Sequence, residues 1–553
     1  MLQGNKCCFY IASVREVSAT IASFCTCQKP PAEGTSHQVL YTTAKMSKKV
    51  AIVGSGCSGI GALWALKNTQ HDVHLFEADS RLGGHTNTVH FKGQNGDVTP
   101  VDAGFIVMNT ATYPNFLRFL QQVGIQTRKT EMSFGVSRDY GDFEWAGRSL
   151  RAVFANDWSF MSPRRWRLIF DIVRFNQFAL DVIIHEDESE QDPLAGTGRP
   201  QAHNYRQLSI GEYLEREGYS QTFKDDYLIP MTAMVWSTAP DKASLHFPAL
   251  TLIRFMWNHH LLNTITERPD WLTIPGGTRQ YLDAVMKDFP KDKVHLRTKV
   301  TAVVPETKER VMLRTESDDL LFDHVILATH GDTALDLLKP VATKQELDIL
   351  DGFRTNHNIA VLHSDLSLMP KRKPTWSAWN FITESPFPPT KTLNVSKVCL
   401  TYCMNMLQHI PDQYGPVLVT LNPLHPPKTE LTQGIWEYSH PVYDAKAIRS
   451  QKLLPNIQNK RGVSFCGAWT KYGFHEDGFS SGLAAAQNHL GVELPFEFVD
   501  STFSRGQKPV LTLKNHAVRV LIQLIQLYVV LGGFIWDTLT ERLNLDGVKS
   551  KKL

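Results

Sequence analysis

Lys49–Glu77, with the sequence KVAIVGSGCSGIGALWALKNTQHDVHLFE, decides the fold. Its first five residues form a short β-branched run, and Ile60–Lys67 follows with a helical pattern. Val73–Glu77 then forms a second run typical of a buried strand. This order predicts a βαβ unit and therefore a parallel sheet at the start of the folded part of the chain.

Three glycines in the turn of this unit have the spacing G-x-G-x-x-G: Gly54, Gly56 and Gly59. The first permits a tight turn, the second lets the backbone approach a pyrophosphate, and the third lets helix and strand pack closely. The helix start at Cys57 and Ser58 offers free N–H groups and a partial positive charge to phosphates. The turn therefore predicts a dinucleotide site.

Two further features of the same region support that site. Glu77 ends the second strand, 18 residues after Gly59, where its carboxylate can accept hydrogen bonds from ribose hydroxyls. Arg81–Thr86, RLGGHT, contains a second glycine turn that can bring backbone amides to the same pyrophosphate from the other side. The first motif alone does not distinguish FAD from NAD, and the second turn favours FAD.

The segment from Glu77 to Gly84 resembles the E-x(3)-R-x-G-G signature of the flavin amine oxidase superfamily. Four later segments are also similar to that family: Val101–Gly104 (VDAG), Trp271–Arg279 (WLTIPGGTR), the strand around Val300, and Phe465–Gly482 (FCGAWTKYGFHEDGFSSG). In the family, the segment matching VDAG lies near the flavin, and the segment matching WLTIPGGTR enters the second part of the flavin domain. The strand matching that around Val300 meets the adenine, and the last segment meets the flavin ring and the ribityl chain. The resemblance extends from Lys49 to about Leu490 and implies FAD.

The GGHT turn and the ending GF-HEDG-F-SSG resemble one branch of that superfamily in particular. This branch holds predicted NAD/FAD-binding proteins that are associated with cyclopropane-fatty-acid synthases and related to flavin fatty-acid isomerases. The relationship implies an unsaturated acyl substrate.

The resemblance implies an α/β fold of the amine oxidase type, in which a Rossmann-like FAD-binding domain is interleaved with an α+β substrate domain. Residues 48–100, 265–345 and 462–500 are predicted to form the FAD-binding domain. Residues 101–264 and 346–461 are predicted to form the substrate domain.

The expected cofactor contacts follow from these motifs, and non-covalent FAD is expected because no cysteine suited to covalent attachment is evident. His85 replaces the arginine of the R-x-G-G-R motif in amine-oxidising members, which removes a permanent charge. His475 is the candidate acid–base group near the flavin, with a packing histidine as the alternative. No metal site is predicted. The predicted cofactor-binding residues are Gly54, Gly56, Cys57, Ser58, Gly59, Glu77, Ala78, Arg81, Gly83, Gly84, His85, Thr86, Val300, Trp469, Asp477 and Gly478.

The resulting function hypothesis is an FAD-dependent oxidoreductase, or a redox-neutral isomerase, acting on an apolar and fatty-acyl or lipid-like small molecule by hydride transfer to flavin N5. The alternatives are a flavin amine oxidase that produces hydrogen peroxide, and a flavoprotein whose FAD is mainly structural. Phe247–Trp257 (FPALTLIRFMW) could line an acyl tunnel, although ordinary core is the simpler interpretation. The basic run Arg164–Arg167 is interpreted as a solvated face, and His259-His260 lacks the partners of a metal site.

Composition sets outer limits on these hypotheses. The chain has 553 residues, 42% of them hydrophobic, and a net charge of +3, which is too small to indicate nucleic-acid binding. Eight cysteines do not make a disulfide scaffold and favour an intracellular protein. Residues 1–45 are expected to be a disordered extension, a targeting peptide (a mitochondrial one included) or the product of an upstream start before Met46.

The C-terminal part contains an apolar segment. Val520–Trp536, VLIQLIQLYVVLGGFIW, carries no charge and predicts a hydrophobic helix over about 515–540. Its 17 residues are at the short limit for crossing a bilayer. Three interpretations remain open: a helix that spans a membrane, a helix that lies on a membrane surface, which is favoured over a span, and a helix buried against the protein.

Overall fold

The computed structural model describes residues 47–148, 150–154, 161–186, 208–236, 245, 247–263, 268–384, 399–503 and 505–528. The predicted extension 1–45 lies outside the described residues, as does the predicted C-terminal helix beyond residue 528.

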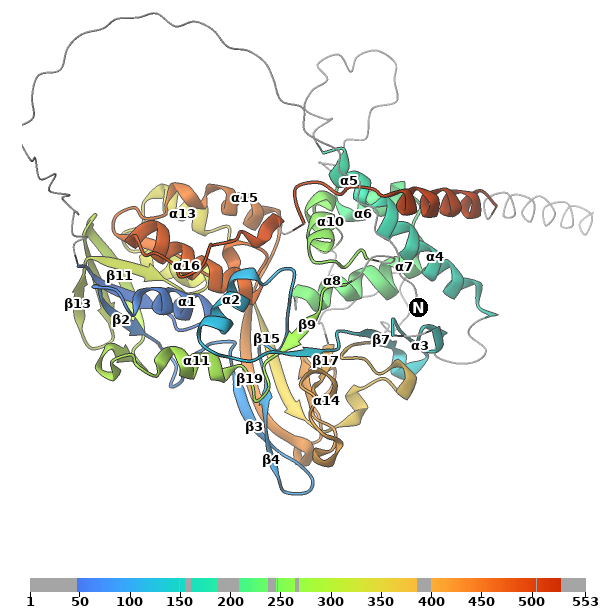
Figure 1. The fold of residues 1–553 in the computed structure, drawn as a ribbon, viewed down its shortest axis with the longest axis horizontal. Coiled ribbons are helices and arrows are strands. Elements are labelled where there is room, and N and C mark those ends of the chain that lie inside the picture. Colours follow the sequence, from blue (N-terminus) through green and yellow to red (C-terminus); the bar gives the residue numbers. More distant parts are fainter. Residues whose placement is uncertain are drawn as a thin grey trace, which may run out of the picture. The chain divides into compact units, whose positions relative to one another are not determined.

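The predicted βαβ unit is present (Figure 1). It consists of β1 (Lys49–Val53), α1 (Cys57–Leu66) and β2 (Asp72–Phe76). These strands join β10 (Val294–His295), β14 (His324–Leu327) and β20 (Val463–Phe465) in a parallel five-stranded sheet of order β10-β2-β1-β14-β20. Segments far apart in the sequence therefore build one sheet around the first strand.

Both faces of this sheet are covered. Val50, Ile52 and Leu75 lie in one hydrophobic cluster with α1 and α16 (His475–Leu490), and Ala51 and Val53 lie in another cluster on the opposite face. The strands therefore carry near-continuous apolar runs, as strands buried on both faces do.

Glycines bring α1 and α16 together. A Cβ on Gly61 would lie 2.6 Å from the carbonyl oxygen of Phe479, and one on Gly482 would lie 2.0 Å from that of Ser58. The two helices can approach this closely only because side chains are absent at both positions.

Two predictions for this part of the chain need correction. The sequence Val294–Val304 (VHLRTKVTAVV) alternates as a single antiparallel strand would, but that prediction is wrong, because β10 ends at His295 and pairs in parallel with β2. The antiparallel pairing begins only at β11 (Val300–Thr307), which pairs with β12 (Arg310–Thr315) and through it with β13 (Asp319–Phe322). The sequence also predicts a closing helix from Gly478 to Leu490, and this helix begins earlier, at His475.

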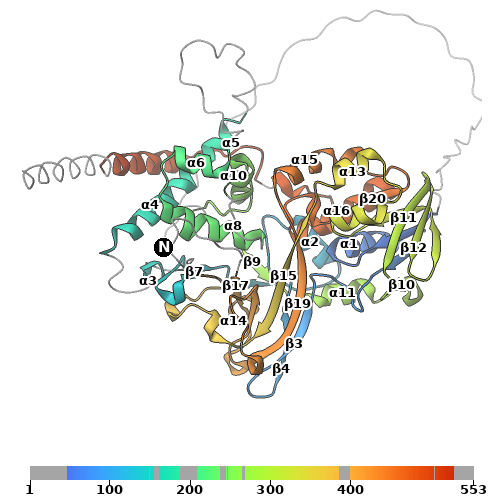
Figure 2. The ribbon, with the colours of Figure 1, turned by 180° about the vertical axis from the view of Figure 1, so that it is seen from behind.

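A seven-stranded sheet forms the second large part of the structure (Figure 2). Its most buried strands pack against helices that form a common hydrophobic cluster with them. The strand order is β19 (Thr432–Pro441), β15 (Thr355–His363), β18 (Leu418–Leu421), β17 (Cys399–Cys403), β16 (Trp379–Thr383), β7 (Phe134–Arg138) and β8 (Phe143–Ala146).

The helices of that cluster lie mainly between β8 and β9 in the sequence. The sequence Ser209–Glu212 has the spacing of a capping box, and this prediction is confirmed, because the Ser209 side chain accepts a hydrogen bond of 3.2 Å from the N–H of Glu212. These helices are α4 (Pro163–Phe178), α5 (Leu180–Ile184), α6 (Ile210–Arg216), α7 (Gln221–Phe223), α8 (Ile229–Trp236) and α10 (Ala249–Asn258).

The remaining elements connect the two large sheets or flank them. Two small sheets are β3 (Thr88–Lys92) with β4 (Val98–Asp102), and β5 (Met108–Asn109), β9 (Trp271–Thr273) and β6 (Arg128–Thr130) in that order. The other α-helices are α2 (Pro114–Gln122), α3 (Leu150–Phe154), α11 (Arg279–Met286), α12 (Gly331–Leu338), α13 (Lys344–Leu350), α14 (Met404–Leu407) and α15 (Ala445–Leu453).

The last described helix covers residues 513–528. Arg519 attaches it to the protein through an ion pair of 2.8 Å with Asp181, and Ile522 is buried. Several apolar side chains on the same helix are more than half exposed, among them Val520, Leu521, Leu524 and Leu527. Within the described part of the chain, no helix combines the length and the apolar character that a membrane span needs.

Candidate functional site

The first glycine turn has the backbone that the sequence predicts. Gly54 has a φ of 99°, and its N–H donates to the carbonyl of Phe76 at 2.8 Å, which joins the start of the turn to the end of β2. A Cβ on Gly59 would lie 1.9 Å from the carbonyl oxygen of Gly54, so only glycine fits there. Both residues are therefore required by the backbone itself.

Gly56 has a different environment. No heavy atom lies within 4 Å of the position where its Cβ would be. Gly56 also precedes α1 as its N-cap, and it supplies no side-chain hydrogen bond to the first N–H groups of that helix. Open space beside uncapped helix N–H groups fits an anionic group such as a pyrophosphate.

The second glycine turn faces the first. Gly84 has a φ of 54°, and a Cβ there would lie 3.3 Å from the Cα of Gly56. Arg81 holds this turn, because one of its terminal nitrogens donates to the carbonyl of Gly84 at 2.8 Å. The two turns predicted to flank a pyrophosphate are therefore brought together.

Ser55 and Glu77 connect the turns. One carboxylate oxygen of Glu77 accepts hydrogen bonds from the N–H of Ser55 at 2.9 Å and from its hydroxyl at 2.5 Å. The N–H of Gly83 in turn donates to the carbonyl of Ser55 at 3.1 Å. The role of Ser55 as a bridge was not predicted, because nothing in a G-x-G-x-x-G motif specifies the residue at that position.

His85 lies beside Tyr438 and His440 of β19, with ring centroids 5.0 Å and 5.1 Å away. Its Nε2 atom is buried and has no hydrogen-bond partner among the described residues. Burial, followed by the charges of nearby groups, His440 first among them, lowers the pKa of His85 well below its usual value. A neutral imidazole with an unpartnered buried nitrogen fits a site that is completed by a bound polar group.

His475 belongs to a buried chain of hydrogen bonds. Its Nε2 shares a hydrogen bond of 3.0 Å with the hydroxyl of Tyr281, which is also bonded to the hydroxyl of Thr86. The imidazole stacks on Phe105 with a centroid distance of 3.7 Å. Burial lowers the pKa of His475 to about 3, so the ring is neutral near pH 7. Its role as an acid–base group stays a prediction.

Tyr281 was not predicted as a site residue, although it connects Thr86 with His475. It lies in α11, just after the segment Trp271–Arg279 that resembles the family. Its place in the site depends on the contact between α11, the second glycine turn and α16, and no local pattern in the sequence reveals that contact.

The start of α16 approaches the start of α1. A Cβ on Gly478 would lie 2.4 Å from the Sγ atom of Cys57. Asp477 is buried, and its carboxylate accepts a hydrogen bond of 3.0 Å from the N–H of Phe474, so it stabilises the first turn of α16 from inside the helix. Asp477 could also be predicted to be the N-cap of this helix, but that alternative is wrong, because the N-cap is Phe474.

Glu476 has a structural role. Its carboxylate accepts hydrogen bonds from the N–H groups of Asn115 at 3.1 Å and Phe116 at 2.9 Å, which are in the first turn of α2. Burial raises the pKa of Glu476 to about 7 despite these donors. This carboxylate therefore binds α2 to α16.

The remaining predicted residues lie at the edges of this region. Ala78 is exposed after β2, and Val300 begins β11 two residues after Thr298, whose N–H donates to the carbonyl of Glu77 at 2.9 Å. Trp469 lies in the core, where its indole donates to the carbonyl of Thr329 at 2.8 Å. Contact of these three residues with a cofactor stays a prediction.

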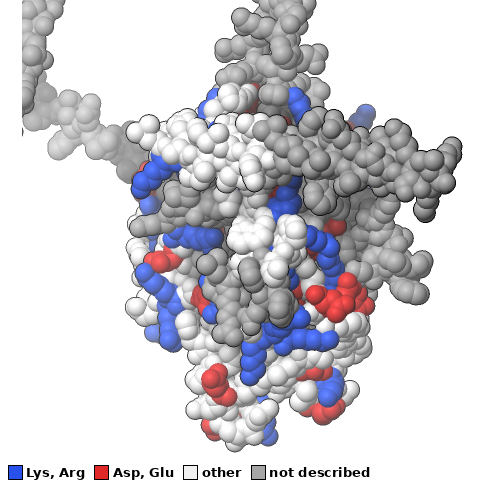
Figure 3. All heavy atoms as spheres, turned by 90° about the vertical axis from the view of Figure 1, so that its right-hand side faces the viewer, with Lys and Arg blue, Asp and Glu red and all other residues white. Residues whose placement is uncertain are grey.

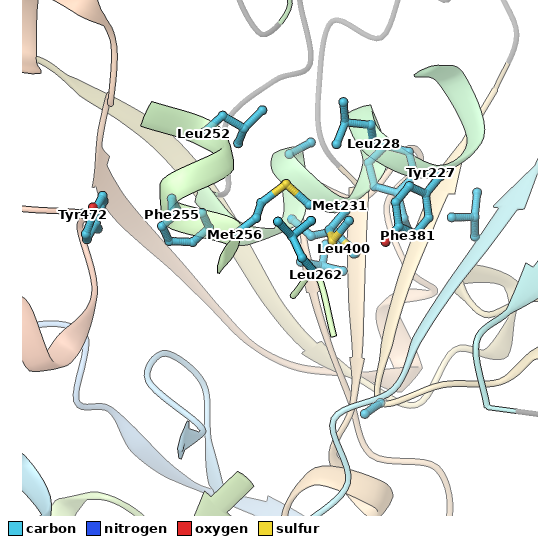
Figure 4. Close-up of a cluster of buried hydrophobic side chains, with 14 of the residues drawn as sticks. Tyr227, Leu228, Met231, Leu252, Phe255, Met256, Leu262, Phe381, Leu400 and Tyr472 are labelled. Carbon is cyan, nitrogen blue, oxygen red and sulfur yellow. The ribbon is translucent and has the colours of Figure 1, made fainter. Parts of the chain in front are cut away.

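A cavity of about 720 Å³ lies among α4, α8 and the strands β7 and β8. Its walls are mainly apolar and aromatic and include Met132, Phe134, Trp145, Leu168, Met231 and Trp379. Figure 4 shows the neighbouring core, in which Met231 and Leu262 lie between helices and the strands that carry Phe381 and Leu400. His259 also lines the cavity, and its ring is 4.9 Å from that of Phe474, which precedes α16.

The cavity tests two interpretations of the sequence. None of the residues 247–257 is among its described lining residues, so this stretch, which forms most of α10, is core rather than a tunnel wall. The interpretation of Arg164–Arg167 as a solvated face is wrong for Arg165, which lines the cavity. A helix in contact with a cavity must turn some residues of a charged run inward because of its 3.6-residue period.

No three His, Cys, Asp or Glu side chains in the described ranges form a group that could hold a metal ion.

The sequence model of the flavin-containing amine oxidoreductases matches residues 57–363, more than half of the chain. The chain therefore belongs to this family. The predicted membership of the flavin amine oxidase superfamily is confirmed.

Two curated relatives are proteins of Arabidopsis thaliana. A 15-cis-phytoene desaturase is 24% identical over 225 residues, which are 38% of this chain and 36% of the relative. Protoporphyrinogen oxidase 2 is 36% identical over 93 residues, 17% of this chain and 16% of the relative. The chain spans about a third or less of the length of these relatives.

Solved structures of similar fold cover most of the chain. The CLA-producing fatty acid isomerase from P. acnes has a TM-score of 0.51 and 14% identity, and the alignment covers 80% of this chain and 98% of the isomerase. Putrescine oxidase bound to putrescine has a TM-score of 0.55 and 16% identity, with 81% and 99% covered. These similarities confirm the predicted fold class. The exact division into two interleaved domains stays a prediction.

Proposed function

We propose that the protein binds FAD without a covalent bond and acts on an apolar, lipid-like substrate as an oxidoreductase or a redox-neutral isomerase. The observation that carries the proposal is the apolar cavity, because its wall includes His259, which contacts the residue that precedes α16. The cavity therefore offers an apolar space for a hydrocarbon chain next to the start of α16, where several predicted cofactor-binding residues lie.

The glycine turns provide the proposed cofactor site. The open space at Gly56, the uncapped start of α1 and the turn held by Arg81 fit a pyrophosphate, and Glu77 fits a ribose. A bound flavin supplies a hydride acceptor at N5. The protein's own contribution is to orient the two partners and to exclude water.

Non-covalent binding is supported by the cysteines of the region. Burial raises the pKa of the Cys57 thiol to about 12, and it also raises the pKa of Cys466. A thiol that stays protonated is a poor nucleophile, so neither cysteine is activated for covalent attachment of a cofactor.

The two histidines of the cavity wall suit a substrate that reacts at an uncharged carbon atom. Burial lowers the pKa values of His259 and His260 to about 4, so both rings are uncharged near pH 7. Two similar proteins are named for phytoene and for a fatty acid, which agrees with an apolar substrate. The similarity to putrescine oxidase supports the alternative, an amine oxidase that produces hydrogen peroxide.

The proposal includes contact with a membrane surface through helix 513–528. Its exposed leucines form an apolar surface next to a buried Ile522 and the anchoring Arg519. The described surface on this side of the protein carries more basic than acidic side chains (Figure 3). Apolar side chains next to basic ones favour contact with anionic lipid.

Anaerobic incubation of the purified holoprotein tests the chemical part of the proposal. Unsaturated fatty acids such as oleic acid should bleach the visible flavin band or yield positional isomers, which mass spectrometry detects even without bleaching. Amines should do neither. Peroxide release with an amine in air, without any lipid product, would support the amine oxidase instead. A flavin that no candidate compound reduces and no lipid product would indicate a structural cofactor.

A further inference from the structure

The charges on the apolar cavity are unbalanced. Three arginines line it, Arg148, Arg165 and Arg268, but Glu131 is the only acidic residue among its described lining residues. Glu131 is already engaged, because its carboxylate lies 2.6 Å from the guanidinium of Arg148. Arg165 and Arg268 therefore line an apolar cavity whose described lining offers them no free carboxylate.

Arg165 is held in place by neutral partners. One of its terminal nitrogens donates to the carbonyl oxygens of Glu144 and Val153, at 2.9 Å each. The guanidinium lies over the ring of Phe143, 4.9 Å from its centroid. Among the described residues no carboxylate lies within 4.0 Å of it. These contacts fix the orientation of the side chain but leave its charge unpaired.

Asp226 and Glu144, two acidic groups whose charges act on Arg165, are bound elsewhere. Asp226 forms ion pairs with Arg138 and Arg164, the latter at 3.4 Å. Glu144 pairs with Arg372 at 3.1 Å. Burial lowers the pKa of Arg165, as expected for a cation that has lost water without gaining an anion.

Arg268 is more exposed than Arg165, and among the described residues it forms no ion pair. Its described hydrogen bond is a long one of 3.5 Å to the carbonyl of Asn263. Arg268 and Tyr227 both line the cavity. Tyr227 also contacts Trp145, the neighbour of Glu144 in β8, with ring centroids 6.0 Å apart.

We propose that this cavity binds an amphipathic molecule with a carboxylate head, which pairs with Arg165 while the hydrocarbon chain lies against the apolar walls. A guanidinium fork binds a carboxylate through two parallel hydrogen bonds, and such bonds are strongest away from water. The same charge repels an ammonium group, so the cavity selects acids over amines. The substrate class deepens the proposed function and rests on it, but the binding step is measured without turnover.

Titration calorimetry of the holoprotein with three ligands of equal chain length tests the proposal. The ligands are dodecanoate, its methyl ester and dodecylammonium, each below its micelle concentration. The wild type should bind the acid about 10-fold tighter than the ester or more, which corresponds to ~1.4 kcal/mol or more. The ammonium should bind more weakly than the ester. Equal binding of acid and ester would overturn the proposal.

Variants locate the head group. Arg165→Met should weaken dodecanoate about 10-fold or more and leave the ester unchanged, so the ester also reports that the fold is intact. Arg165→Lys should restore part of the preference for the acid. The matched control is Arg164→Met, one residue away on α4 and outside the described lining. An acid preference that survives in Arg165→Met would overturn the assignment.

A second variant keeps the test independent of folding. If Arg165→Met does not fold, Arg268→Met removes an exposed cation and should weaken dodecanoate several-fold without affecting the ester; no effect on the acid would overturn the proposal. Failure of the proposed function has a different signature, because dodecanoate would then bind as expected while no lipid is transformed. Lipid turnover with equal binding of acid and ester would contradict only the present proposal.

Discussion

The two glycine turns and the apolar cavity are built in different ways. The turns depend on backbone: Gly54 and Gly59 permit a conformation and a contact, and the exposed groups are N–H donors. The cavity depends on side chains from α4, α8 and distant strands. A site made of backbone can be read from a short motif, whereas a site made of distant side chains exists only after the chain has folded.

The largest effect is expected in the first glycine turn, where substitution of Gly59 should disturb folding and substitution of Gly56 should disturb only cofactor binding. Gly59→Val should lower the free energy of unfolding by about 1–3 kcal/mol or more and abolish flavin binding, because its Cβ would overlap the carbonyl of Gly54. Thermal unfolding and flavin content measure the two effects. Gly56→Ala should fold normally, since its Cβ meets open space, but should bind flavin weakly. Full flavin content in Gly56→Ala would contradict the pyrophosphate site.

A second expected effect concerns Glu476, which joins α2 to the turn region. Burial raises its pKa to about 7 from 4.5, so between these values the folded state holds a proton that the unfolded chain does not. The stability contributed by this group is therefore present below pH 4.5 and is lost as the pH rises towards 7. The amide in Glu476→Gln does not titrate.

Denaturant unfolding measured from pH 4.5 to 7 checks this sign. The wild type should lose stability relative to Glu476→Gln by up to ~1.4 kcal/mol per pH unit. Glu493→Gln, a change at an exposed position, should give a curve parallel to that of the wild type. Parallel curves for wild type and Glu476→Gln would show that the carboxylate titrates alike in both states.

On the cavity side, Met234→Trp should fill part of the space. We expect about 10-fold weaker binding of both dodecanoate and its methyl ester, with unchanged flavin content, because Met234 lines the cavity away from the glycine turns. Calorimetry and absorbance measure both quantities. Met161→Trp places the same side chain at an exposed position and should have no effect. Loss of flavin in Met234→Trp would mean that the two regions are not separable.

The smallest effect on folding is expected at helix 513–528. Leu521 is 56% exposed and Ile522 is 3% exposed. Leu521→Glu should leave thermal stability within about 0.5 kcal/mol of the wild type and weaken sedimentation with anionic vesicles several-fold. Ile522→Glu should instead destabilise the helix contact by burying a charge. Undiminished vesicle binding by Leu521→Glu would argue against contact of the membrane with this face.

The sequence by itself determined the parts of the protein in which short-range backbone geometry is decisive. The β-branched run Lys49–Val53, the spacing of Gly54, Gly56 and Gly59, and the capping box at Ser209 each specify a local structure through few neighbouring residues. Local sterics act between residues close in the chain, so a pattern in the sequence records them.

Tertiary structure alone decided which distant side chains meet. Tyr281 joins Thr86 to His475, and Glu476 accepts hydrogen bonds from the start of α2. Arg165, which belongs to a basic run in the sequence, lines the cavity. Each outcome depends on how helices and sheets pack, and each of these side chains is equally compatible with a solvated or structural role in the sequence. Burial, which changes the charge state of a group and the value of a hydrogen bond, is set only by that packing.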